Sequence, residues 1–399
     1  MEKYQHTPGS EVEARIRVLQ HNIARLDLEG ALIIHHTNLF YFSGTSQSAH
    51  LFVPREGKPL LLVRKSFDRA VEESPIKDIL DVKSLKAIPA LLAERGFHAG
   101  KIGLELDIIP YNTYEHYAKV FAAFSLVDIS GAIKRQRMIK SPYEIDLLRE
   151  AAAVQDAVFA EVPSMLKEGM LEIELASLFE AGMRRRGYSG GCKMRTFNQD
   201  FFMGNVNAGS SGAVPTYFDG PVGGAGVSPA NNPQGAGWKA IGRNEPVYID
   251  YTCILNGYTV DQTRMFCIGE LANPMLLRAY AAALRIQDAL TAFIAPGVIC
   301  EDVYALALEL VQKEGLVDNF MGKGQDKVRF VGYGVGLELD EYPIFAQGLK
   351  VPVEEGMVFA LEPKFVFLEG AIGIENTHYV QGDKVHRLTW ASQEIICLP

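Results

Sequence analysis

Residues 246–269 read PVYIDYTCILNGYTVDQTRMFCIG, and this stretch decides the fold of the second half of the chain. Two runs of apolar and β-branched residues flank Asn256-Gly257, a dipeptide that strongly predicts a two-residue β-hairpin turn. Asp250 and Asp261 lie on the two arms of this hairpin. Alternation along each strand predicts that both carboxylates lie on one face, opposite each other, and their apolar neighbours direct them inward.

Two further acids lie in strand-like apolar segments nearer the C-terminus. Glu362 follows VFAL, and Glu375 lies within GIENT. One such acid is most simply a charge at the end or edge of a strand. Four of them point instead to converging carboxylates, which need a compensating cation or shared protons. The cations nearest in sequence, Arg264 and Lys364, are not expected to point inward.

Length and composition exclude several classes of protein. The chain has 399 residues, 48% of them apolar, which is enough for two domains. A net charge of −9 and a pI of 5.6 argue against nucleic acid or an anionic membrane as a partner. Five widely spaced cysteines without a CxxC pattern predict reduced thiols in a cytoplasmic protein. We expect no secretory signal and no membrane span.

The order of elements predicts two domains. Before residue 135, strands alternate with helices: residues 31–44 predict a buried strand followed by a turn, and residues 51–65 predict a hairpin. Ser141-Pro142 with Glu144 forms a capping box that predicts the first helix of a new domain. We therefore expect an α/β domain over residues 1–138 and an α+β domain over residues 139–399.

Within the second domain, residues 204–237 are rich in Gly, Ser, Pro and Asn and predict an irregular loop near the site. A phosphate-binding loop would need a strand before it and a helix after it, and neither flank fits. Helices are predicted over residues 274–292 and 301–314, with strands after them.

The acids carry a resemblance to the pita-bread metallopeptidases, the group that contains aminopeptidase P, prolidase and creatinase. The spacing of Asp250 and Asp261, Glu362 before a proline, and Glu375 before Asn-Thr resemble the acids that bind two metal ions in that family. Residues 31–44 resemble its creatinase-like N-terminal domain, and residues 133–152 resemble the start of its catalytic domain. The resemblance implies an α/β creatinase-like domain, a pita-bread domain and a homodimer.

Residues 331–341, VGYGVGLELDE, depart from this resemblance. The family places a metal-binding His between the first two glycines, where this chain has Tyr333. A second family His falls on Asp340, a third falls in the loop at Asn231-Asn232, and a family Arg falls on Gly373.

The resemblance also implies roles for individual residues. It assigns the metal ligands to Asp250, Asp261, Glu362 and Glu375. It assigns proton transfer to Glu362, further catalytic roles to Tyr333 and Asp340, and substrate contacts to Asn231 and Asn232.

The metal itself is expected to be a divalent ion such as Mn, Fe, Co or Zn, as the resemblance implies. The oxygen donors favour Mg, Ca, Mn or Fe over Zn or Cu. A phenol that stays protonated is a poor ligand, so Tyr333 is expected to fill space or donate a hydrogen bond. The alternative is a metal-free site in which the acids share protons.

Three functions stay open. The first is a metal-dependent hydrolase of small peptides or peptide-like molecules with a changed pocket. The second is a non-peptidase enzyme on the same fold, either a metal-free hydrolase like creatinase or a lyase, whose substrate would be cationic because Asp340 adds negative charge. The third is an inactive protein that only binds small molecules.

Overall fold

The computed structural model describes residues 5–199, 203–230 and 233–399, and the chain divides between Arg137 and Met138 into two compact units. Among the described residues, no helix has the length and apolar character that crossing a bilayer requires. The five cysteines are free thiols, and four of them are buried.

The N-terminal unit is built on one mixed six-stranded sheet with the strand order β4-β3-β2-β1-β5-β6. The first three strands are antiparallel neighbours, whereas β4, β5 and β6 pair in parallel. The strands are β1 (Gly30–Ile33), β2 (Ala49–Pro54), β3 (Leu60–Val63), β4 (Ile79–Asp81), β5 (Gly100–Leu104) and β6 (Phe124–Asp128). The helices are α1 (Gly9–Arg25), α2 (His36–Ser43), α3 (Phe67–Glu73), α4 (Ile88–Ala93), α5 (Tyr111–Val120) and α6 (Ser130–Met138), with a 3₁₀ turn, η1, at Leu85–Ala87.

The secondary structure predicted for this unit from the local sequence is partly confirmed. The hairpin predicted over residues 51–65 is confirmed as the antiparallel pair β2–β3. The segment 31–44 begins as the buried strand β1, but α2 follows it where only a turn was predicted. Gly44 ends that helix with φ +78°, a conformation that glycine adopts without strain.

The C-terminal unit holds three sheets, with strand orders β17-β9-β8-β7, β11-β10-β12-β15-β16 and β13-β14. Its helices are α7 (Pro142–Met165), α8 (Glu172–Arg185), α9 (Pro274–Phe293) and α10 (Cys300–Glu314), with 3₁₀ turns η2 (Gly209–Ala213) and η3 (Val317–Asn319). Its strands are β7 (Gly204–Ala208), β8 (Val247–Leu255), β9 (Tyr258–Ile268), β10 (Phe330–Gly334), β11 (Glu341–Ala346), β12 (Val358–Leu361), β13 (Lys364–Phe367), β14 (Gly370–Gly373), β15 (Asn376–Gln381), β16 (Lys384–Arg387) and β17 (Ile396–Leu398).

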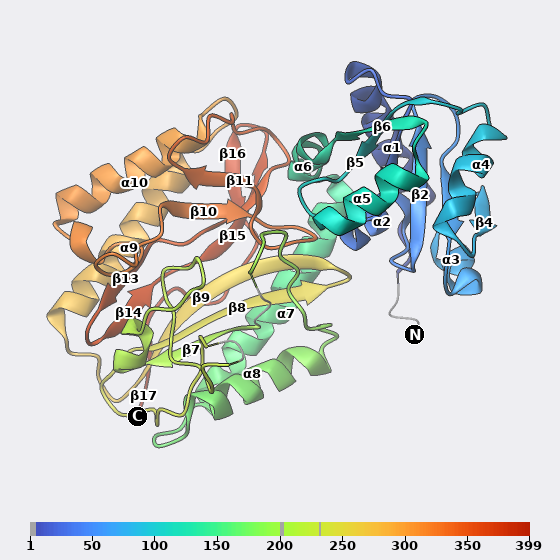
Figure 1. Ribbon diagram of the computed structural model, residues 1–399. Coiled ribbons are helices and arrows are strands. Elements are labelled where there is room, and N and C mark those ends of the chain that lie inside the picture. The colour runs from blue at the N-terminus through green and yellow to red at the C-terminus, as the bar shows by residue number, and fades with distance from the viewer. Residues whose placement is uncertain (1–4, 200–202, 231–232) are drawn as a thin grey trace. The chain divides into compact units, whose positions relative to one another are not determined.

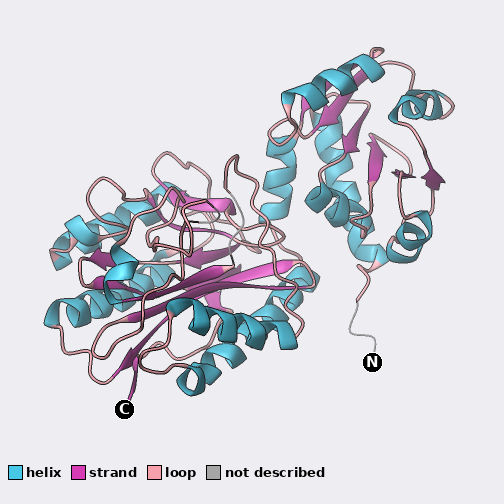
Figure 2. Ribbon diagram, turned by 60° about the horizontal axis from the view of Figure 1, so that its bottom comes forward, coloured by secondary structure: helices cyan, strands magenta, loops and turns pink. Residues whose placement is uncertain are grey.

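Strands form the interior of this unit and helices cover its outside (Figures 1 and 2). Helix α7 packs on β8 and β9 (Figure 1). Helix α9 packs against β13, β14 and β16, and α10 packs against β10 and β11. An isolated bridge between Thr263 and Glu375 joins β9 to the segment that enters β15. The long β8–β9 hairpin therefore lies against the sheet that carries the C-terminal acids.

The capping box is confirmed at the start of α7. The Ser141 hydroxyl accepts a hydrogen bond from the Glu144 amide at 3.2 Å, and the Glu144 carboxylate accepts one from the Ser141 amide at 3.0 Å. The loop predicted over residues 204–237 contains strand β7, which pairs with β8. Its Gly-Asn-Val-Asn-Ala sequence has weak strand propensity, so this strand depends on a partner about 40 residues away.

Candidate active site

The β8–β9 hairpin positions the first two acids. Asn256 and Gly257 both have positive φ, as the predicted turn requires, and the strands pair from Leu255–Tyr258 outward. The pairing sets Asp250 opposite Thr263 and Asp261 opposite Thr252, so the two acids are diagonal neighbours on one face. The predicted common face is confirmed, whereas the prediction that they lie directly opposite each other is wrong by two residues.

Glu362 and Glu375 reach the same place from the other sheet. Glu362 follows the last residue of β12, and Glu375 precedes the first residue of β15; both are buried. Thr263 fixes Glu375 by donating a hydrogen bond to its Oε2 at 2.9 Å. The four acids predicted to converge are therefore close together, and we call them the carboxylate cage.

Lys364, the first residue of β13, lies inside the carboxylate cage. Its Nζ is 2.9 Å from Asp250 Oδ2, 2.5 Å from Glu362 Oε2 and 2.7 Å from Glu375 Oε2. The lysine is 1% exposed, so the expectation that it points away from the acids is wrong. A lysine inside an apolar strand is rarely buried unless it is paired with an acid. This rule could have indicated from the sequence that Lys364 points toward the carboxylates.

Arg264 also points inward, against expectation. It is 1% exposed, and its guanidinium donates to the carbonyl oxygens of Thr263 and Glu375 and to the Asn376 side chain. These bonds hold the backbone on both sides of Glu375. Arg264 thus supports the cage from behind without making a hydrogen bond to its carboxylates.

Tyr333, on β10, closes the other side of the carboxylate cage. Its hydroxyl lies 2.7 Å from Asp261 Oδ2 and 2.8 Å from Glu375 Oε1. A phenol carries one proton and can fully satisfy only one of two carboxylates, so a second proton on one of the acids completes the contact. Burial and the charges of Asp261 and Glu375 raise the pKa of Tyr333 well above its ordinary value, which keeps the phenol protonated.

Electrostatics support protons shared within the cage. Burial, followed by the charges of Glu375 and Asp250, raises the pKa of Asp261 well above its ordinary value. Burial also raises the pKa of Glu362 and of Glu375, and Lys364 opposes part of that rise. Burial alone would lower the pKa of Lys364, but its three carboxylate neighbours outweigh burial and hold it charged.

A cavity of about 40 Å³ opens beside the cage, which is room for a few water molecules. Asp250, Asp261, Tyr333, Glu362 and Lys364 line one side of it. The Oε1 of Glu362 is buried and accepts no hydrogen bond from the described residues.

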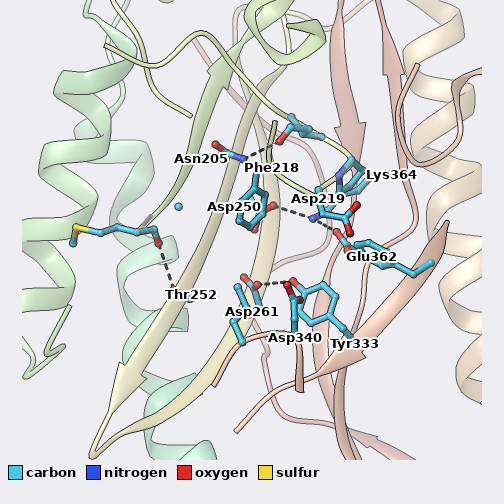
Figure 3. Close-up of a pocket in the computed structure, with 17 residues that line it drawn as sticks. Asn205, Phe218, Asp219, Asp250, Thr252, Asp261, Tyr333, Asp340, Glu362 and Lys364 are labelled. Atoms are coloured by element: carbon cyan, nitrogen blue, oxygen red, sulfur yellow. Dashed lines mark hydrogen bonds and ion pairs between the residues drawn. The ribbon is translucent and has the colours of Figure 1, made fainter. Parts of the chain in front are cut away.

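Phe218, Asp219 and Asp340 also line the cavity, and Asp340 lies on the side of Tyr333 (Figure 3). Burial and the nearby charge of Asp219 raise the pKa of Asp340 to about 7. Asp340 thus lies beside the cavity as expected, and Asp219 is a neighbour that the sequence alone did not indicate. The predicted substrate residues Asn231 and Asn232 lie outside the described residues.

The oxygen donors that a metal ion would need are present, but the space between them is taken. Asp250, Asp261 and Glu375 offer oxygens within 4.8 Å of one another. A metal at about 2.0–2.6 Å from Asp250 and Glu375 would meet the Lys364 ammonium, which already contacts both at hydrogen-bond distance. The Tyr333 hydroxyl fills the position between Asp261 and Glu375. This arrangement does not fit a metal ion.

Comparisons with known proteins agree with the two units. Residues 146–382 match the model of Metallopeptidase family M24, and residues 15–139 match the Creatinase/Prolidase N-terminal domain. The chain is 27% identical over 388 residues to the uncharacterized peptidase YqhT of Bacillus subtilis, covering 96% of this chain and 100% of that protein. It is 25% identical to the Xaa-Pro dipeptidase of Pyrococcus furiosus, covering 92% and 95% of the two chains.

Solved structures show the same fold. The Xaa-Pro dipeptidase from Bacillus anthracis aligns with a TM-score of 0.83 at 23% identity, covering 97% of this chain and 100% of that one. The prolidase from Pyrococcus horikoshii aligns with a TM-score of 0.80 at 23% identity, covering 96% and 100%. The predicted fold class, a creatinase-like α/β domain followed by a pita-bread domain, is confirmed.

Proposed function

Because the chain belongs to metallopeptidase family M24, we propose that it is a hydrolase that cleaves an amide bond in a small peptide or peptide-like molecule. The observation that supports this proposal is the state of Glu362. Its Oε1 is buried beside the cavity and has no hydrogen-bond partner among the described residues, while its Oε2 is held by Lys364. A fixed carboxylate with one free oxygen toward a cavity is the arrangement that general base catalysis needs.

In the proposed reaction, Glu362 Oε1 accepts a proton from a water molecule as the water oxygen bonds to the substrate carbonyl carbon. The C–N bond then breaks, and the proton passes from Glu362 to the departing nitrogen. One amide and one water give one carboxylic acid and one amine. Burial raises the pKa of Glu362, which makes its carboxylate a better proton acceptor than an exposed glutamate.

The proposal does not depend on a metal ion, although relatives in this family are metallopeptidases by name. The positions between the carboxylates are filled by Lys364 and Tyr333. The water must therefore be activated by the chain's own groups. This also separates the proposal from the expectation of a metal-dependent hydrolase with bound Mn, Fe, Co or Zn.

A second candidate is a non-peptidase reaction on a positively charged small molecule. Asp219 and Asp340 face the same cavity, and the charge of Asp219 helps to raise the pKa of Asp340. A cationic substrate group placed near both acids would relieve this repulsion. Such a substrate would fit the changed pocket that the sequence predicts.

A substrate panel tests the proposal. The purified enzyme is incubated with Xaa-Pro dipeptides, other dipeptides and small amides with and without a cationic group, and released amine is measured. Glu362→Gln should lower kcat on any substrate by about 100-fold or more. Glu369→Gln, at an exposed position in the turn between β13 and β14, is the matched control. If no substrate in the panel yields amine, the proposed function is wrong. If only Xaa-Pro dipeptides are cleaved rapidly, the prediction of a changed substrate pocket is wrong.

We further propose that the protein works in the cytoplasm as a homodimer. Free cysteines suit a reducing compartment, and the family resemblance implies the dimer. Light scattering should give twice the 44.0 kDa of one chain. A 44.0 kDa species at all concentrations would contradict the dimer.

A further inference from the structure

We propose that Lys364 is a built-in cation that replaces metal ions in the carboxylate cage, so that this protein binds no divalent metal there. The role of the cage in hydrolysis rests on the function proposed above. The occupation of the cage by lysine rests on the contacts of Lys364 alone.

All three N–H donors of the Lys364 ammonium group have hydrogen-bond partners. A lysine ammonium has three N–H donors and no acceptor. Three carboxylate oxygens lie around Lys364 Nζ at 2.5, 2.7 and 2.9 Å, from Glu362, Glu375 and Asp250. Each donor therefore has a charged partner. A divalent ion would have to displace this group from all three acids, against like-charge repulsion.

Other oxygens of the carboxylate cage also have partners, whereas Glu362 Oε1 has none among the described residues. Tyr248 donates to Asp250 Oδ2 at 2.5 Å, and Tyr333 lies between Asp261 and Glu375. The Gln262 amide donates to Asp261 Oδ1 at 2.9 Å. One ammonium and the shared carboxyl protons thus offset the negative charge of the cage, and the neutral phenols add hydrogen bonds.

The neighbouring strand β14 makes room for the lysine at a glycine. Lys364 pairs across the β13–β14 hairpin with Gly373. A Cβ atom at position 373 would lie 2.7 Å from Lys364 Cγ and 2.8 Å from Lys364 Cα, so a side chain there would displace the lysine. The centroid of the Tyr248 ring lies 5.7 Å from Lys364 Nζ. The glycine at position 373 therefore leaves the room that the lysine stem occupies.

Lys364 then acts as a positioning residue. It holds Glu362 through Oε2, which leaves Oε1 directed at the cavity. A covalently attached cation cannot be removed by a chelator. The site should therefore keep its charge balance in conditions that strip metal from an enzyme.

Metal uptake gives the test. Wild-type protein, treated with chelator and desalted, is equilibrated with MnCl₂, CoCl₂ or ZnCl₂, and bound metal is counted by elemental analysis after dialysis. We expect no stoichiometric metal at the cage. Lys364→Met, which keeps the length and loses the charge, should gain about one equivalent of metal. Lys364→Met combined with Asp250→Asn should lose that gain.

Two results would overturn the inference. One is that the wild-type protein binds one equivalent of metal whereas the Asp250→Asn variant binds none. The other is a folded Lys364→Met protein that takes up no more metal than wild type. The wild-type titration decides the question even if the variant does not fold. It is also independent of turnover, so a metal-free protein that cleaves nothing would refute the proposed function and leave this inference intact.

Discussion

Replacing Asp340 by Asn is expected to stabilise the C-terminal unit at pH 8 and to have a much smaller effect at pH 5. Burial, followed by the charge of Asp219, raises the pKa of Asp340 to about 7. Asp340 has φ +58°, in the left-handed region that asparagine tolerates well. The substitution therefore removes a charge without disturbing the backbone.

The structure sets the size and the sign of this effect. A rise of the pKa from 3.8 to about 7 corresponds to a ceiling of about 4 kcal/mol, at about 1.4 kcal/mol per pH unit. Asp340 is only half-buried, so solvent screening reduces the expected gain to about 1–3 kcal/mol. The folded protein binds the proton more tightly than the unfolded chain. The stability from this group is thus complete below pH 3.8 and is lost as the pH rises through about 7.

Urea unfolding at pH 5 and pH 8 measures the difference. Both tryptophans, Trp238 and Trp390, belong to the C-terminal unit, so their fluorescence follows the part of the chain that contains Asp340. At pH 5 the gain should be less than about half of that at pH 8. Asp383→Asn, at an exposed turn, is the control. An equal gain at both pH values, or a loss of stability at pH 8, would refute the reasoning.

Three other substitutions or reagents probe the site and the core. Tyr333→Phe removes the hydroxyl shared by Asp261 and Glu375, and thermal unfolding should show a loss of about 2–4 kcal/mol; an unchanged midpoint would contradict this. Arg264→Met removes buried donors to the Glu375 carbonyl, so hydrogen exchange near Glu375 should accelerate. A thiol reagent should modify Cys397 rapidly and the other cysteines only after unfolding, because Cys397 alone is exposed among the five.

The hairpin acids were predictable because their signal is local. Asn256-Gly257 fixes the turn, and the turn fixes the register and the face of each residue on β8 and β9. Asp250 and Asp261 therefore follow from sequence to within a two-residue offset. Strand β7 was missed because its stability comes from pairing with β8, far along the chain.

Lys364 was missed for a different physical reason. Strand alternation predicts sides only along an unbroken strand, and Glu362-Pro363 separates β12 from β13, which belong to different sheets. The side to which Lys364 points could therefore not be predicted from the alternation of residues 358–361. The sequence offered only the rule that a lysine among buried apolar residues needs an anionic partner.

The close approach of Lys364 to Gly373 makes the two positions epistatic. A side chain at residue 373 meets the lysine stem at 2.7 Å, and removal of the lysine uncovers three carboxylates at once. A residue without a Cγ at position 364 would relieve only the contact at 2.7 Å, whereas the contacts of a new Cβ with the Cα of residue 364 and with the Pro363 carbonyl oxygen, both at 2.8 Å, would remain. An exchange of the lysine-filled cage for a metal-filled one is therefore expected to begin at position 364, with residue 373 kept as glycine.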